Sequence, residues 1–294
     1  MGPVAVGRVA WIAAAALLVL AVTACGERSE PTGPNAALYP VTIASPSGGR
    51  PLVARAPARR IAVIAPSVQA ILVDLGAARQ IAGTPVARNG SLRVTELRGL
   101  RPDLIVASST TDDRLLAQAA RTVPKALVYQ APDDSIRGVE GTITALGLLT
   151  GRPGAASRLV RGIEEKRGLV ARRLAGARGV SVFVDKGFFT TVSDQSLVGD
   201  MLREVHARNV AGDAAQIGPL DPEQLARLDP AWYLATSDSG TTLAKLRRNP
   251  RTRKLAAVQA GRFAIVSARL LEPGPAVGAG LLTLARRLHP DAFR

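Results

Sequence analysis

The residues best suited to bind a ligand follow predicted strands of an α/β fold. Ser109 and Thr110 come directly after the apolar run 104–107, and Tyr129 ends the run 126–129. In open parallel sheets, ligands bind outside the carboxyl ends of the strands, so these hydroxyl groups are candidates for hydrogen bonds to a ligand. A capping or core role is the alternative for Tyr129.

Charged and aromatic side chains follow other predicted strands. Arg88 comes after the strand 81–84, and its guanidinium could pair with the oxygens of an anionic ligand through two hydrogen bonds. A solvated loop arginine is the alternative. Phe188 and Phe189 follow the strand 180–184, where their rings could form a cleft wall or pack into the core. The corresponding loops farther along the chain complete the candidate set with Ser237 and Arg269.

The sequence offers little for catalysis or for a bare metal ion. Its two histidines, His206 and His289, lie far apart, and no cluster of His, Asp or Glu has the spacing of a zinc site. The segment Gly-Arg-Pro-Gly at 151–154 lacks the Gly-Lys-Ser/Thr ending of a phosphate loop. We therefore expect neither an enzyme nor a bound cofactor.

Short apolar runs alternate with helical segments over most of the chain, which predicts βα units and parallel sheets. The pattern divides into an α/β lobe at 41–150, a connecting helix at 151–176 and a second α/β lobe at 177–294. Strands are expected at 41–43, 61–64, 81–84, 104–107, 126–129, 180–184, 232–235 and 263–266. Helices are expected at 68–75, 113–121, 135–149, 199–205, 220–228, 243–248 and 276–288, besides the connecting helix.

The N-terminus has the pattern of an exported, lipid-anchored protein. Arg8 is the only charged residue among the first 24, and residues 9–24 are apolar apart from Thr23, as in a signal peptide. Residues 20–25, Leu-Ala-Val-Thr-Ala-Cys, resemble the bacterial lipobox, and lipidation would explain the single cysteine, Cys25. We expect a signal peptide at 1–24, a lipid on Cys25 and a flexible tether at 25–40. An ordinary signal peptide or an uncleaved anchor is the alternative.

The composition bounds the partners. Hydrophobic residues make up 47% of the chain, enough for a substantial core, whereas aromatic residues make up only 3%. The formal net charge of +15 suggests an anionic partner or a solvated, arginine-rich surface. Because the arginines are scattered and do not alternate with aromatic residues, nucleic acid is not an expected partner.

Several short motifs occur along the chain in a distinctive order and spacing. They are 60–67 (Arg-Ile-Ala-Val-Ile-Ala-Pro-Ser), 71–76 (Ile-Leu-Val-Asp-Leu-Gly), 100–107 (Leu-Arg-Pro-Asp-Leu-Ile-Val-Ala), 221–225 (Asp-Pro-Glu-Gln-Leu), 228–230 (Leu-Asp-Pro), 249–250, 257–262 and 273–275. Together they resemble the ABC-transporter solute-binding proteins for iron siderophores, cobalamin and haem, and the resemblance covers roughly residues 41–294.

The resemblance implies two Rossmann-like lobes joined by one long helix, with a ligand cleft between them. It implies a monomer on the outer face of the cytoplasmic membrane that delivers a ferric siderophore or related chelate to an ABC permease. Asp113 and Glu223 match the acidic residues that meet arginines of the permease, although both begin predicted helices, where helix capping is the alternative. Cobalamin or haem binding, or a sensing or adhesion role without a permease, remain alternatives. A single helical connector predicts little domain motion.

Overall fold

The computed structural model describes residues 38–44, 50–213 and 219–294. The chain divides into two units, residues 1–39 and 40–294, and the elements described below belong to the second. The predicted signal peptide, Cys25 and nearly all of the predicted tether lie outside the described residues. No helix within the described ranges is both long and apolar enough to cross a membrane.

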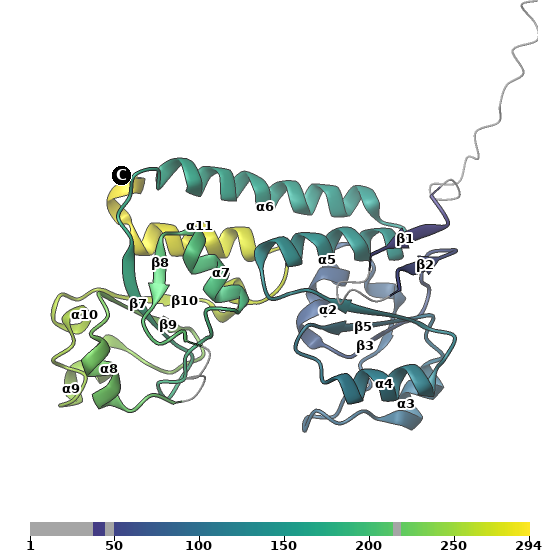
Figure 1. Ribbon diagram of the computed structural model, residues 1–294, viewed down its shortest axis with the longest axis horizontal. Coiled ribbons are helices and arrows are strands. Elements are labelled where there is room, and N and C mark those ends of the chain that lie inside the picture. Colours follow the sequence, from purple (N-terminus) through teal and green to yellow (C-terminus); the bar gives the residue numbers. More distant parts are fainter. Residues whose placement is uncertain (1–37, 45–49, 214–218) are drawn as a thin grey trace, which may run out of the picture. The chain divides into compact units, whose positions relative to one another are not determined.

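The N-terminal lobe, from β1 to α5, contains a four-stranded parallel sheet (Figure 1). Its strand order is β4-β3-β5-β6, and β5 pairs along its whole length with β6. The residues of β3 and β5 are buried throughout, which explains why these strands are continuous apolar runs in the sequence. The strands are β3 (Ile61–Val63), β4 (Ile81–Gly83), β5 (Leu104–Ser108) and β6 (Leu127–Ala131).

An antiparallel pair of short strands precedes this sheet, and β2 packs near β6. The pair consists of β1 (Val41–Ile43) and β2 (Leu52–Ala54). The helical segments of the lobe are α2 (Pro66–Asp74), η1 (Ala78–Gln80), α3 (Val94–Leu100), α4 (Asp113–Thr122) and α5 (Ile136–Leu149).

The C-terminal lobe, from β7 to η4, repeats the arrangement with a second four-stranded parallel sheet of order β10-β9-β7-β8. Its strands are β7 (Val180–Asp185), β8 (Ala207–Asn209), β9 (Trp232–Thr236) and β10 (Phe263–Val266). Its helical segments are α7 (Leu197–Glu204), α8 (Pro222–Leu228), α9 (Leu243–Arg248), α10 (Ala256–Gln259), η3 (Ala268–Leu271), α11 (Val277–Leu288) and η4 (Pro290–Phe293). Two parallel α/β sheets confirm the predicted fold class.

The long helix α6 (Pro153–Arg173) connects the lobes and packs against α5 of one and α11 of the other (Figure 1). Its buried residues Ala156, Ile163 and Val170 recur every seven positions, so they form one face. Two glycines allow close approach: a Cβ added at Gly278 of α11 would lie 3.0 Å from the Cα of Ile163, and one at Gly147 of α5 would meet Ala156.

Polar contacts also join α5, α6 and α7. Arg167 of α6 donates hydrogen bonds to Glu140 of α5 at 3.2 Å and to Glu204 of α7. The backbone N–H of Ile136, at the start of α5, donates to the carboxylate of Asp200 of α7 at 2.9 Å. The two lobes are therefore linked by side-chain contacts as well as by the chain itself.

Candidate functional site

A pocket of about 510 Å³ is lined by residues of both lobes. Ser67, Ser109, Thr110, Asp133 and Asp134 come from the N-terminal lobe, and all five follow the carboxyl ends of β3, β5 or β6. The C-terminal lobe contributes Lys186, directly after β7, the segment 191–198 except Asp194, and Leu271 and Pro273. The volume is within the range of small-molecule sites, and the position is where open α/β sheets bind ligands.

The wall formed by the N-terminal lobe is organised around Asp133, which is 5% exposed. One carboxylate oxygen, Oδ1, accepts hydrogen bonds from the backbone N–H of Ser109 at 3.0 Å and from its hydroxyl at 2.7 Å. The other accepts a longer bond of 3.4 Å from the hydroxyl of Ser67. Asp133 therefore fixes the loops that follow β3 and β5 relative to the end of β6.

The wall formed by the C-terminal lobe is supported by a second buried carboxylate, Asp185, at the end of β7. It accepts hydrogen bonds from the Tyr233 hydroxyl at 2.8 Å, the Thr241 hydroxyl at 2.6 Å and the Gly187 N–H at 2.8 Å. Burial raises the pKa of Tyr233 far above its ordinary value, and the nearby Asp185 carboxylate raises it further. The phenol thus remains a donor, and Asp185 fixes the turn that begins with Lys186.

Three helices begin at the pocket. Ser67 lies in the first turn of α2, Asp134 precedes the N-cap of α5, and Ser196 is the N-cap of α7. Unpaired N–H groups and a partial positive charge at helix N-termini favour electron-rich oxygen atoms of a ligand. The ionisable lining residues are Lys186, Asp133 and Asp134, so the lining itself has a formal charge of −1 despite the basic chain.

Two of the predicted ligand-binding residues, Ser109 and Thr110, line this pocket. Arg88 does not: it is exposed in a turn between Val86 and Leu92, after the edge strand β4. Tyr129 is only 2% exposed and belongs to the core of its lobe. This placement agrees with the alternative of a core tyrosine and not with contact to a ligand.

The remaining candidates also lie outside the pocket lining. Phe188 is 88% exposed, whereas Phe189 packs against the core of its lobe. The Ser237 hydroxyl accepts a hydrogen bond from the N–H of Ala268 at 3.1 Å, which is a structural role in a turn. Arg269 is exposed on η3, two residues before the lining residue Leu271.

The two acidic residues predicted to meet a permease are exposed in the first turns of α4 and α8. Neither is the N-cap: Asp112 caps α4, and Asp221 forms a capping box with Gln224 in α8. Asp113 is therefore not required for capping. Glu223 lies 3.7 Å from Arg251 in an exposed ion pair.

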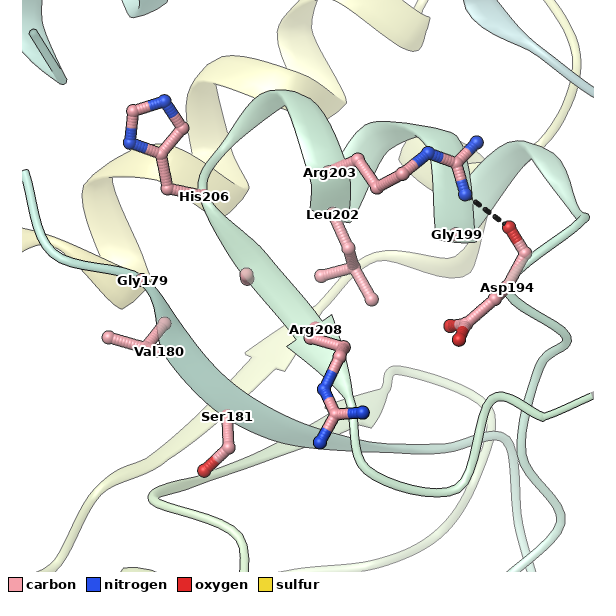
Figure 2. A pocket seen from close by; sticks show the side chains of 10 residues that line it. Gly179, Val180, Ser181, Asp194, Gly199, Leu202, Arg203, His206 and Arg208 are labelled. Atoms are coloured by element: carbon pink, nitrogen blue, oxygen red, sulfur yellow. Dashed lines mark hydrogen bonds between the residues drawn. The ribbon is translucent and has the colours of Figure 1, made fainter.

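A second pocket, of about 660 Å³, lies in the C-terminal lobe alone (Figure 2). It is lined by the start of β7, by β8 and by α7, and includes Arg203, His206 and Arg208. Arg203 donates to the backbone carbonyl of Asp194 and, at 2.9 Å, to the carboxylate of Asp200. Because one lobe forms this pocket at the amino ends of its strands, the interlobe pocket is the better candidate site.

Metal ligation by the protein itself finds no support in the part of the chain that the structure describes, where no three His, Cys, Asp or Glu residues gather. Sequence reasoning missed Ser67, Asp133 and Lys186, although all three follow predicted strands. The rule that ligand-binding residues follow the carboxyl ends of strands, which identified Ser109, applied to these three residues as well. The charges of Asp133 and Lys186 could have drawn attention to them.

Comparisons with known proteins agree with this geometry. A family model described as "Periplasmic binding protein" matches residues 86–270, more than half of the chain. The uncharacterized ABC transporter substrate-binding lipoprotein YvrC of Bacillus subtilis (strain 168) is 23% identical over 309 residues, covering 95% of this chain and 97% of YvrC.

Solved structures share the fold. The periplasmic heme-binding protein BhuT, in complex with two hemes, has a TM-score of 0.66 at 22% identity, covering 80% of this chain and 99% of BhuT. Helicobacter pylori CeuE with Ni(II) bound has a TM-score of 0.72 at 16% identity, covering 86% of this chain and 90% of CeuE. The chain therefore belongs to the periplasmic binding protein family, as its sequence motifs indicated.

Proposed function

We propose that this protein captures a ferric siderophore-type chelate in the interlobe pocket and delivers it to an ABC importer. The observation that carries the proposal is the pocket of about 510 Å³ lined by the strand ends of both lobes. The family assignment and the similarity to the lipoprotein YvrC support the transport role and attachment through Cys25.

The pocket chemistry favours a ligand with many acceptor oxygens and little net charge. Hydroxyl groups dominate the polar lining, and the helix N-termini and Lys186 add further donors. A ferric trihydroxamate is neutral or weakly cationic, whereas a ferric tricatecholate has three negative charges. With Asp133 and Asp134 in the lining, repulsion disfavours the tricatecholate.

Haem and cobalamin are the alternatives within the family, and the haem-binding relative BhuT favours testing haem first. Haem iron in binding proteins takes an axial Tyr or His. Neither residue type lines the interlobe pocket, and Tyr129 is buried. The sensing or adhesion alternative would show as an absence of binding to every chelate tested.

The test is calorimetric titration of the processed chain, Cys25–Arg294 with Cys25→Ser, with a ferric trihydroxamate, a ferric tricatecholate, haem and cyanocobalamin. Trp232 is the only tryptophan among the described residues and pairs with Val182, away from the carboxyl end of β7, so intrinsic fluorescence is a poor reporter. We expect saturable binding of the trihydroxamate alone.

Substitutions locate the site. Lys186→Gln and Ser109→Ala should each weaken binding about 10-fold, the loss that removal of one good hydrogen bond produces. Arg88→Gln is the matched control outside the pocket and should leave affinity within about 2-fold, because Arg88 does not line the pocket. Tightest binding of haem or cobalamin would replace the siderophore assignment.

Delivery is tested separately in cells. Asp113→Lys and Glu223→Lys should abolish uptake of the ligand while leaving its affinity unchanged, because both side chains are exposed and neither lines the pocket. Uptake that persists in the double variant would show that the importer meets another surface. Cys25→Ser should release the protein from the membrane fraction in a high-salt wash, in which the lipidated protein stays bound.

A further inference from the structure

A group of basic side chains occupies the amino ends of the N-terminal sheet, opposite to the edge that forms the ligand pocket. We call it the basic face. Arg60 precedes β3, Arg101 precedes β5 and Lys125 precedes β6. All its members are exposed, and they are Arg55, Arg59, Arg60, Arg98, Arg101 and Lys125.

The positive charge of this face is not neutralised by the protein. Within the described ranges, no carboxylate lies within ion-pair distance of any of the six side chains. The nearby carboxylate of Asp103 instead accepts hydrogen bonds from the backbone N–H groups of Arg59 at 2.7 Å and Arg60 at 3.0 Å. The side chains therefore remain available to an anionic partner.

Part of the face is concave. An open hollow of about 670 Å³ is lined by Arg60, Thr95, Arg98, Gly99 and Arg101. The Nε of Arg60 donates to the carbonyl of Leu100 at 2.8 Å, which holds this guanidinium in the hollow. Arg101 has a φ of 45°, in the left-handed region, and this turn ends α3.

The N-terminal segment joins the fold at the same end of the sheet. Val41, the first residue of β1, pairs with Ala54, which directly precedes Arg55. Val41 lies sixteen positions after Cys25, and a chain of that length spans at most about 55 Å. A lipid on Cys25 would therefore keep Val41, which lies beside the Arg55 end of the basic face, within about 55 Å of the bilayer surface.

We infer that the basic face binds the anionic headgroups of a phospholipid bilayer. Each basic side chain near such a surface strengthens binding about 5-fold. One lipid chain alone anchors a protein weakly, and stable attachment usually combines it with a second signal such as a basic patch. The six basic side chains would supply that second signal. With the amino ends of the sheet against the membrane, the ligand pocket at the carboxyl ends opens away from it. The undocked protein is thereby oriented for capture.

The test measures sedimentation of the processed chain with Cys25→Ser together with phospholipid vesicles, so it does not depend on lipidation. The vesicles are either phosphatidylcholine alone or a mixture with one-third phosphatidylglycerol. The face variant is Arg55→Gln, Arg59→Gln, Arg98→Gln and Lys125→Gln. The control removes four exposed arginines elsewhere, by Arg172→Gln, Arg173→Gln, Arg247→Gln and Arg248→Gln.

We expect binding to the mixed vesicles only, weakened by added salt and reduced about 100-fold or more in the face variant. The control should lose less than about 5-fold, although its net charge is the same. Equal losses in both variants would overturn the inference, because net charge alone would explain them. Displacement by millimolar inorganic phosphate, or tighter binding to a DNA duplex than to vesicles, would also overturn it.

Discussion

Asp133 accepts two hydrogen bonds from Ser109, one from its backbone N–H at 3.0 Å and one from its hydroxyl at 2.7 Å. The pair joins the loops after β6 and β5, which are neighbours in the sheet. Because Asp133 is 5% exposed, water cannot readily replace it as the acceptor. The arrangement of the pocket wall therefore depends on one buried carboxylate.

Two substitutions of Asp133 should show how much the hydrogen bonds that it accepts contribute to stability. Asp133→Ala leaves the N–H of Ser109 without its acceptor, and the free energy of unfolding should fall by about 2 kcal/mol. Asp133→Asn retains an acceptor oxygen and should cost less than about 1 kcal/mol. Urea unfolding monitored by circular dichroism measures both values. Equal losses in the two variants would show that the hydrogen bonds to Ser109 contribute little.

Removing Arg167 should destabilise the junction of the lobes. Arg167→Met keeps much of the apolar stem but leaves Glu140 and Glu204 without their partner, and burial already raises the pKa of Glu140. The side chains are partly exposed, so the expected loss is about 2 kcal/mol rather than that of a fully buried pair. The triple variant Glu140→Gln, Arg167→Met and Glu204→Gln should recover part of the lost stability. No recovery would show that packing of the arginine stem causes the loss.

His289 should make stability depend on pH. Its Nε2–H donates to the carbonyl of Val205 at 2.7 Å, and burial lowers its pKa below the ordinary value of 6.5. Between the folded and unfolded pKa values, the unfolded chain binds more protons, so the free energy of unfolding falls as pH decreases below about 6.5. His289→Gln should flatten this part of the profile. Urea midpoints across this range provide the measurement, and an unchanged slope would contradict it.

The turn after β7 contains two consecutive phenylalanines with left-handed backbones, Phe188 at φ 51° and Phe189 at φ 57°. Asparagine tolerates this conformation better than phenylalanine, so Phe188→Asn should raise the free energy of unfolding by about 0.5 to 1 kcal/mol. Phe189→Asn relieves the same strain but removes a ring packed in the core, and should lower it by about 2 kcal/mol. Thermal unfolding compares the two, and destabilisation by Phe188→Asn would mean that the exposed ring has a partner.

Much of the fold follows from periodicity alone. The expected strand 263–266 and helix 243–248 match β10 and α9 residue for residue. The elements that were not expected are β2, α3, β8, α10 and the short segments η1, η3 and η4. They are short, and β8 has only the three residues Ala-Arg-Asn, too few to display an alternating pattern.

The pocket was less predictable because strand ends differ in where they lie in the sheet. The predictions based on Ser109 and Arg88 used the same rule, but β5 pairs with β6, whose loop also lines the pocket, whereas β4 lies at the opposite edge of the sheet. Only the loops after β3, β5 and β6 line the pocket on that side. Strand order depends on how the helices cross the sheet, and local sequence patterns do not contain it.

The contacts of Arg167 with α5 and α7 have a consequence for how the molecule opens. Local opening of α6 would break both ion pairs at once and also expose the faces that it buries against α5 and α11. The amide hydrogens of these helices should therefore exchange with solvent in one cooperative step, as a single foldon that spans both lobes. The outer strands and helices of each lobe would exchange earlier, in steps that leave this foldon intact.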